Sequence, residues 1–73
     1  DPQELIANAL KPASCLQVVI KDDINKYALA IVPDDQFSLA IGKLGKNVKL
    51  AVEVTKWNID IKTLDQAQTE GLI

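Results

Sequence analysis

The sequence predicts an α+β domain in which helices pack on one face of a three-stranded mixed sheet. Three short runs alternate apolar and polar side chains, as strands do, and three others repeat apolar side chains at helical spacing. The order along the chain is helix, strand, strand, helix, helix, strand. A length of 73 residues is enough for one small domain and too short for two.

The first half of the chain predicts a helix followed by a strand hairpin. Apolar spacing indicates a helix over residues 2–10, which Pro12 ends. Residues 15–21 and 26–32 have the alternation of strands. The polar cluster 22–25 between them supplies the side chains that favour a turn.

The second predicted strand has one large and one small face. Tyr27, Leu29 and Ile31 share the first face, and we expect them to pack in the core. Ala28 and Ala30 share the second face. Because alanine leaves room above a sheet, we expect the two helices downstream to pack closely on this second face.

A pair of helices follows the hairpin. Pro33 ends the strand, and Asp34 or Asp35 is expected to cap the next helix with its carboxylate. Gly42 ends that helix by adopting a positive φ, and Gly45 begins another helix after a two-residue connection.

The second half of the chain predicts a longer helix and a third strand. Residues 46–56 combine one narrow polar stripe with a wide apolar arc. Residues 57–62 alternate again and direct Trp57, Ile59 and Ile61 to the core. Residues 63–73 lack a clear period, although Leu64, Ala67 and Leu72 leave open a weak helix or a segment docked on the surface. We interpret them as a linker or C-terminal extension after a domain of residues 1–62. The apolar arc of the helix comprises Val48, Leu50, Ala51, Val52 and Val54.

Composition argues against several classes of function. Cys15 is the single cysteine and histidine is absent, so we expect no disulfide within the chain, no metal site, no cofactor and no enzymatic activity. No apolar run approaches the roughly 20 residues that span a bilayer, and no signal peptide is visible, which makes the cytoplasm the default location. Because the chain begins with Asp1, we interpret it as a piece of a longer protein.

The charge is unevenly distributed. The formal net charge is −2, which by itself disfavours nucleic-acid binding. Residues 42–62, however, hold five lysines against two acids, a net of +3, while the rest holds three lysines against eight acids, a net of −5. One basic segment therefore lies on an acidic body.

A Gly-x-x-Gly motif opens the basic segment. Ile41 precedes Gly42-Lys43-Leu44-Gly45, and the motif lies between two predicted helices. Glycines allow main-chain amides to approach phosphate oxygens, and the second helix directs its partly positive amino end toward them. The plainer interpretation is a turn that needs glycines for its geometry alone. The strand, helix, Gly-x-x-Gly, helix, strand context favours phosphate binding.

This context resembles the minimal motif of KH domains. The additional N-terminal helix is similar to the second KH topology, called type II. Phrases such as Val32-Pro33-Asp34-Asp35-Gln36 and Trp57-Asn58-Ile59-Asp60-Ile61 resemble the second KH domain of NusA-type bacterial transcription factors. The resemblance covers roughly residues 2–62.

The resemblance implies a single-stranded RNA-binding function in transcription elongation, pausing, termination and antitermination. It also implies contact with nascent RNA and RNA polymerase, and an adjacent KH domain in the same chain. The loop and following helix would hold the RNA backbone, apolar side chains would shape a base-binding groove, and the third strand would read base edges through main-chain groups. The implied RNA-binding residues are Ile41, Gly42, Lys43, Leu44, Gly45, Lys46, Asn47, Val48, Lys49, Ile59, Asp60 and Ile61.

The sequence departs from the family pattern at Leu44, where a glycine, polar or charged residue is more usual, and by lacking arginine. Binding by this domain alone is therefore expected to be weak and sensitive to salt. Lys56 is interpreted as part of a solvated face, Trp57 as core rather than a base-stacking platform, and Cys15 as a small buried hydrophobe. A protein-interaction domain with this fold, or a carboxylate-based hydrolase, is favoured less than RNA binding.

Overall fold

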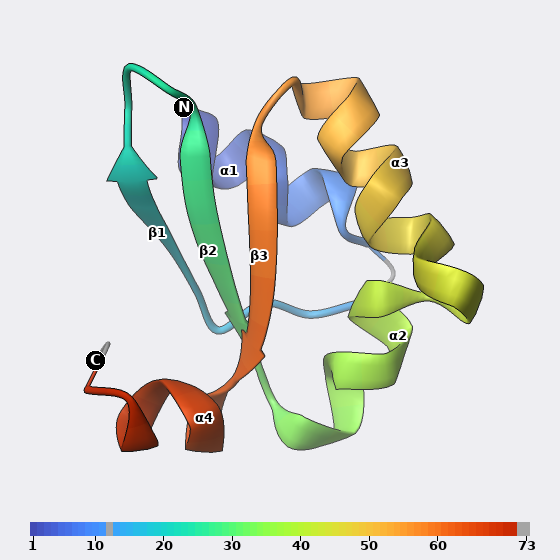
Figure 1. Ribbon diagram of the computed structural model, residues 1–73. Helices are drawn as coiled ribbons and strands as arrows, with labels where there is room; N and C mark the ends of the chain where they lie inside the picture. Colours follow the sequence, from blue (N-terminus) through green and yellow to red (C-terminus); the bar gives the residue numbers. More distant parts are fainter. Residues whose placement is uncertain (12, 72–73) are drawn as a thin grey trace.

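The structure is a computed structural model that describes residues 1–11 and 13–71. The predicted helix end at Pro12 and the last two residues of the predicted linker therefore lie outside the described part. Figure 1 shows the arrangement of the elements. In chain order these are α1 (Pro2–Ala9), β1 (Gln17–Asp22), β2 (Tyr27–Val32), the 3₁₀ helix η1 (Asp34–Gln36), α2 (Phe37–Ile41), the 3₁₀ helix η2 (Lys43–Gly45), α3 (Lys46–Thr55), β3 (Asn58–Thr63) and α4 (Leu64–Thr69).

The sheet is mixed and has β2 in its centre. β1 pairs with β2 in the antiparallel sense, with Gln17 opposite Ile31. β2 pairs with β3 in the parallel sense, with Tyr27 opposite Asn58. Parallel neighbours need a long crossover, and α2 and α3 provide it. This confirms the predicted α+β fold and places α2 and α3 beside the edge strand β3 (Figure 1).

The main core lies between the sheet and three helices. Ala28 and Ala30 are buried and pack against Ile6 of α1, Ala40 of α2 and Ala51 of α3. This confirms the prediction that the alanine face of β2 receives the helices. Asp1 caps α1 by accepting a hydrogen bond from the Gln3 amide at 3.0 Å. Within the described residues, no helix is long and apolar enough to cross a membrane.

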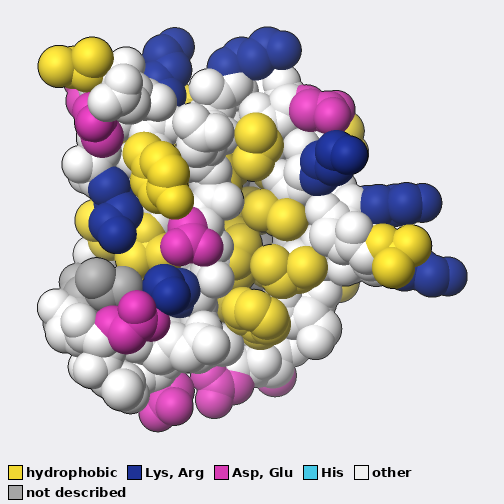
Figure 2. Space-filling model, in the orientation of Figure 1, with side chains coloured by type: hydrophobic (Ala, Val, Ile, Leu, Met, Phe, Trp, Pro, Cys, Tyr) yellow, Lys and Arg dark blue, Asp and Glu magenta, His cyan; other side chains and the backbone are white. Residues whose placement is uncertain are grey.

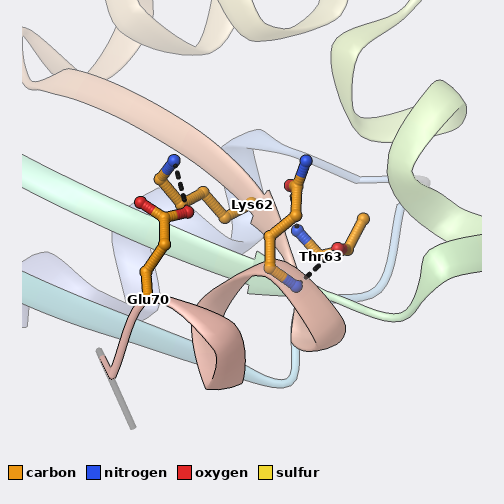
Figure 3. A network of polar contacts seen from close by, with 4 residues as sticks. Lys62, Thr63 and Glu70 are labelled. Atoms are coloured by element: carbon orange, nitrogen blue, oxygen red, sulfur yellow. Dashed lines mark hydrogen bonds and ion pairs between the residues drawn. The ribbon is translucent and has the colours of Figure 1, made fainter.

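The opposite face of the sheet carries α4, where the sequence predicted a linker. Ala67 is buried against Leu29 and Ile31 of β2. Thr63 and Gln66 form a capping box, in which the Gln66 amide donates to Thr63 Oγ1 at 3.1 Å and the Thr63 amide to Gln66 Oε1 at 3.0 Å. Figure 3 shows this box beside the ion pair of Lys62 Nζ with Glu70 Oε2 at 3.0 Å. Of the alternatives that the sequence left open for this segment, the structure has a docked helix rather than a linker at residues 64–69, because the cap and a second small core hold it there.

Three further details differ from the sequence expectations. Tyr27 is 44% exposed, because α4 covers the part of the outer sheet face at Leu29 and Ile31 instead. Lys26 lies in the turn with φ 56° rather than in β2. Asp34 and Asp35 begin η1 without any side-chain capping bond. Trp57 precedes β3 but is buried in the main core, which confirms its predicted packing role.

Candidate nucleic-acid interface

The connection between α2 and α3 is held in place by a close contact at Gly42. Gly42 has φ 79°, and a Cβ added there would lie 2.7 Å from both the Cβ and the amide nitrogen of Asn47. The side chain of Asn47 donates hydrogen bonds to the carbonyls of Leu10 and Ala40, each at 3.0 Å. Asn47 thus joins α3 to α1 and α2 and fixes the position of the connection. The side-chain amide of Asn47 therefore has a structural role that the sequence pattern did not reveal.

The two residues after Lys43 both adopt left-handed backbone conformations. Leu44 has φ 57° and ψ 28°, and Gly45 has φ 75° and ψ 13°. An L residue in this region costs roughly 1–2 kcal/mol, which Gly45 avoids and Leu44 does not. The Leu44 side chain is 87% exposed, so no packing in the described structure offsets that cost. The connection therefore carries a strained and exposed apolar residue.

The amino end of α3 faces this connection without a side-chain cap. Its N-cap residue is Gly45, and no side chain among the described residues accepts a hydrogen bond from the first helical turn. The ten-residue helix α3 presents the positive end of its dipole here. Lys43, Lys46 and Lys49, which we call the lysine row, are exposed on the connection and the first turn. Figure 2 shows lysines projecting from this end of the molecule. The arrangement suits an anion.

Apolar side chains form a strip between β3 and the two helices. Ile41 of α2, Val48 of α3 and Ile59 of β3 are half-buried and pack against the edge of the main core. Val52 is half-buried one helical turn after Val48 on the same side of α3, and we include it in the apolar strip. Figure 2 shows hydrophobic side chains gathered between β3 and the helices. The spacing from Val48 to Val52 was the signal that could have added Val52 to the predicted site.

The free edge of β3 borders the apolar strip. The Asn58 amide donates to the Lys26 carbonyl at 2.8 Å, so Asn58 and, by alternation, Asp60 direct their main-chain groups toward β2. The main-chain groups of Ile59 and Ile61 then point to the free edge. The Ile61 side chain is buried in the core, which leaves its main chain as the part available to a ligand. The side chain of Asp60, which alternates with those of Ile59 and Ile61, lies on the opposite face of the sheet from the apolar strip.

The helix α3 also exposes two side chains of its predicted apolar arc. Leu50 is 58% exposed and Val54 is 63% exposed, while Ala51 is buried. The apolar arc of α3 is therefore wider than the surface that the sheet and the other helices cover. The C-terminal end of α3 is Thr55, and Lys56 follows with φ 64° as an exposed C-cap residue.

Cys15 lies outside this interface, before β1. It is half-buried beside the main core, and burial raises the pKa of its thiol above the ordinary value. A raised pKa keeps the thiol protonated and weakly nucleophilic at neutral pH. The prediction of a small hydrophobe rather than a reactive thiol agrees with this environment.

The fold and the Gly42–Gly45 connection define a KH domain of the second type, with an N-terminal helix before the hairpin and a Gly-x-x-Gly link between the two crossover helices. The family described as the NusA-like second KH domain matches residues 2–69. The chain belongs to this family, and the match includes α4.

Curated relatives agree with the family match. The chain is 48% identical over 73 residues to the transcription termination/antitermination protein NusA of Halalkalibacterium halodurans, covering 100% of the chain and 19% of that protein. It is 47% identical over 72 residues to the protein of the same name from Bacillus subtilis, covering 99% of the chain and 19% of the relative. The Mycobacterium bovis protein is 48% identical over 62 residues, or 85% of the chain and 18% of that relative. The chain thus spans about a fifth of the length of these relatives.

Proposed function

We propose that the chain binds single-stranded RNA as one module of a NusA-like transcription factor that acts in elongation, pausing, termination and antitermination. The supporting observation is the uncapped amino end of α3, which lies behind a glycine connection and beside the lysine row. A phosphate at this end would receive main-chain donors, the helix dipole and lysine charge together. The protein would work in the bacterial cytoplasm, where transcription occurs.

The apolar strip supports RNA more than duplex DNA or a small anion. Unstacked bases have large apolar faces that pack against aliphatic side chains, and their edges form hydrogen bonds. The strip lies beside the phosphate-binding end and borders the free edge of β3 at Ile59 and Ile61. A strand running from the lysine row along this edge would place its phosphates on α3 and its bases on the strip.

Affinity for RNA is expected to be modest for this chain alone. The lysine row supplies three positive charges and the chain has no arginine to form two-point contacts with phosphate. An adjacent KH domain in the same protein, and RNA polymerase, would hold the same nascent RNA nearby. Tethered modules gain apparent affinity without additional contacts. The function proposed here is binding without turnover.

An affinity titration with a short unstructured RNA tests this proposal. The double variant Lys43→Asp/Lys46→Asp removes two cations and adds two anions beside the proposed phosphates. We expect the dissociation constant to rise by at least about tenfold, because like charge repels the polyanion and two phosphate contacts are lost. The dependence of log affinity on log salt should also become shallower, by roughly 0.7 for each phosphate contact that is lost.

The matched control is Lys21→Asp/Lys26→Asp. Both lysines are exposed, and the control changes the net charge by the same amount in and beside the β1–β2 turn. Aspartate tolerates the positive φ of residue 26. Equal weakening by the two double variants would show that net charge alone attracts RNA. If Lys43→Asp/Lys46→Asp leaves RNA affinity unchanged, the result would instead support a domain with the KH fold that binds protein rather than RNA.

A further inference from the structure

A second surface lies beyond the carboxyl ends of β2 and β3. Because these strands are parallel, the segments that follow them, η1 and α4, meet at one end of the sheet. Leu16 joins them there, since its amide donates to the Ile31 carbonyl at 2.7 Å. Between them is an open hollow of about 620 Å³. We call it the acidic hollow, and its lining residues are Leu16, Pro33, Asp34, Asp35, Leu64, Asp65 and Gln68.

The floor of the acidic hollow is apolar. Leu16 is 55% exposed, and Pro33 and Leu64 are half-buried. These three side chains come from three separate segments, and the sheet holds each of those segments in place. The floor is therefore a fixed surface on which an apolar side chain can pack.

The rim of the hollow carries three carboxylates that have no partner within the described residues. Asp34 and Asp35 do not cap η1, and the cap of α4 is made by Thr63 and Gln66 rather than by Asp65. The ion pair found in the described structure joins Lys62 and Glu70 instead. Figure 2 shows acidic side chains along the lower edge of the molecule, where η1 and α4 lie. Each of the three carboxylates lies in the first turn of η1 or α4, where it favours the helix dipole, and remains open to a cation from outside.

The arrangement of the rim discriminates between possible occupants. Asp34, Asp35 and Asp65 do not converge into a group that could hold a metal ion, as judged for residues 1–11 and 13–71. RNA is disfavoured because its phosphates would meet three carboxylates. Lysine and arginine suit such a rim, since their long side chains place separate cations on separate carboxylates while their stems cover apolar surface.

We propose that the acidic hollow docks a basic segment of a partner protein, which inserts one aliphatic side chain between Leu16, Pro33 and Leu64 and places flanking cations on the aspartates. This surface lies away from the lysine row, so the segment and RNA bind at the same time. The charge separation along the chain then has a physical role: one end of the domain attracts RNA, and the other attracts a basic protein segment.

A synthetic peptide that alternates arginine and leucine probes this surface on the 73-residue chain. Amide chemical shifts should change at Leu16, at Asp34 and Asp35, and along α4. The triple variant Asp34→Asn/Asp35→Asn/Asp65→Asn should raise the dissociation constant by about tenfold, because three partly exposed ion pairs are lost. Asp23→Asn, an exposed carboxylate in the β1–β2 turn, is the control and should leave the affinity within about twofold.

Two matched peptides separate the apolar contribution from charge. A peptide with glycine in place of leucine should bind at least about tenfold more weakly, because nothing then fills the apolar floor. If the glycine peptide binds as tightly as the leucine peptide, charge attraction alone explains the binding and the proposal is overturned. Shifts confined to other surfaces, or stronger binding of a peptide with glutamate in place of arginine, would also overturn it. Shifts at the hollow on addition of RNA would assign the surface to nucleic acid and contradict the proposal. The RNA titration of Lys43 and Lys46 variants is independent of all these results.

Discussion

Two sharp turns in this domain satisfy their main-chain amides in opposite ways. In the β1–β2 turn, Asp22 Oδ1 accepts hydrogen bonds from the amides of Ile24 and Asn25 at 3.0 and 3.1 Å, and Asp22 Oδ2 accepts one from Asn25 Nδ2 at 2.6 Å. In the α2–α3 connection, the Gly45 amide donates to the Gly42 carbonyl at 3.1 Å and the Lys46 amide to the Lys43 carbonyl, and no side chain among the described residues caps the first turn of α3. Both turns contain a non-glycine residue with positive φ, Lys26 in one and Leu44 in the other.

A turn of similar sharpness is structural in the hairpin and, in our proposal, a binding site in the α2–α3 connection. A carboxylate of the chain occupies the anion position of the first turn. The second turn has glycines and lysines beside the amino end of α3, and in our proposal an external phosphate takes there the role that Asp22 takes in the hairpin.

The largest expected effect concerns the close contact that positions the connection. Gly42→Ala should lower the free energy of unfolding by about 2–4 kcal/mol, because a Cβ would collide with Asn47 and the positive φ would be strained. Urea unfolding measures this change.

Gly45→Ala is the matched control for this substitution. A Cβ at Gly45 meets nothing within 4 Å, so the cost is that of backbone strain alone, about 1–2 kcal/mol. Equal losses in the two variants would show that the Asn47 contact contributes nothing, and that the two glycines serve only their φ angles.

A smaller effect is expected at the hairpin turn and depends on pH. The main-chain amide and the side chain of Asn25 both donate hydrogen bonds to the Asp22 carboxylate, and these bonds lower the pKa of Asp22. A lowered folded-state pKa stabilises the fold above the unfolded pKa of about 3.9, and this contribution is lost as pH falls through the folded value. Asp22→Asn should therefore destabilise the chain at neutral pH and should reduce the loss of stability between neutral and acidic pH.

Urea unfolding of both forms across that pH range gives the measurement. A parallel pH dependence of wild type and Asp22→Asn would contradict the account of this turn. Asp23→Asn provides the control, since Asp23 is exposed in the same turn and its side chain accepts none of these hydrogen bonds.

Much of the fold could be predicted because side-chain period reports burial directly. Ala28 and Ala30 identified the face that receives α2 and α3, and Gly42 and Gly45 identified the connection between these two helices. The sequence left α4 open between a weak helix and a linker, because a six-residue segment is too short for a clear period. Two signals for it were present: the Thr63-x-x-Gln66 capping box, and the uninterrupted apolar run of β2, which indicates a strand covered on both faces.

The candidate site could be located from the sequence, but the sequence did not show which role each of its residues has. The motif gave the connection and its lysines. It did not show that the Asn47 side chain holds α1 and α2, because that contact joins residues distant in the sequence. It also did not show that Asp60 directs its main chain toward β2, since strand parity alone leaves the free edge undetermined.

Amide chemical-shift mapping with a short single-stranded RNA tests the central claim most directly, because both turns are observed in one spectrum. The account predicts large changes in the amides of residues 43–48 and at Ile59 and Ile61. The amides of Ile24 and Asn25, already bonded to Asp22, should remain unchanged. If the α2–α3 connection is unperturbed, or if the hairpin turn responds as strongly, the connection is not the phosphate-binding element of this domain.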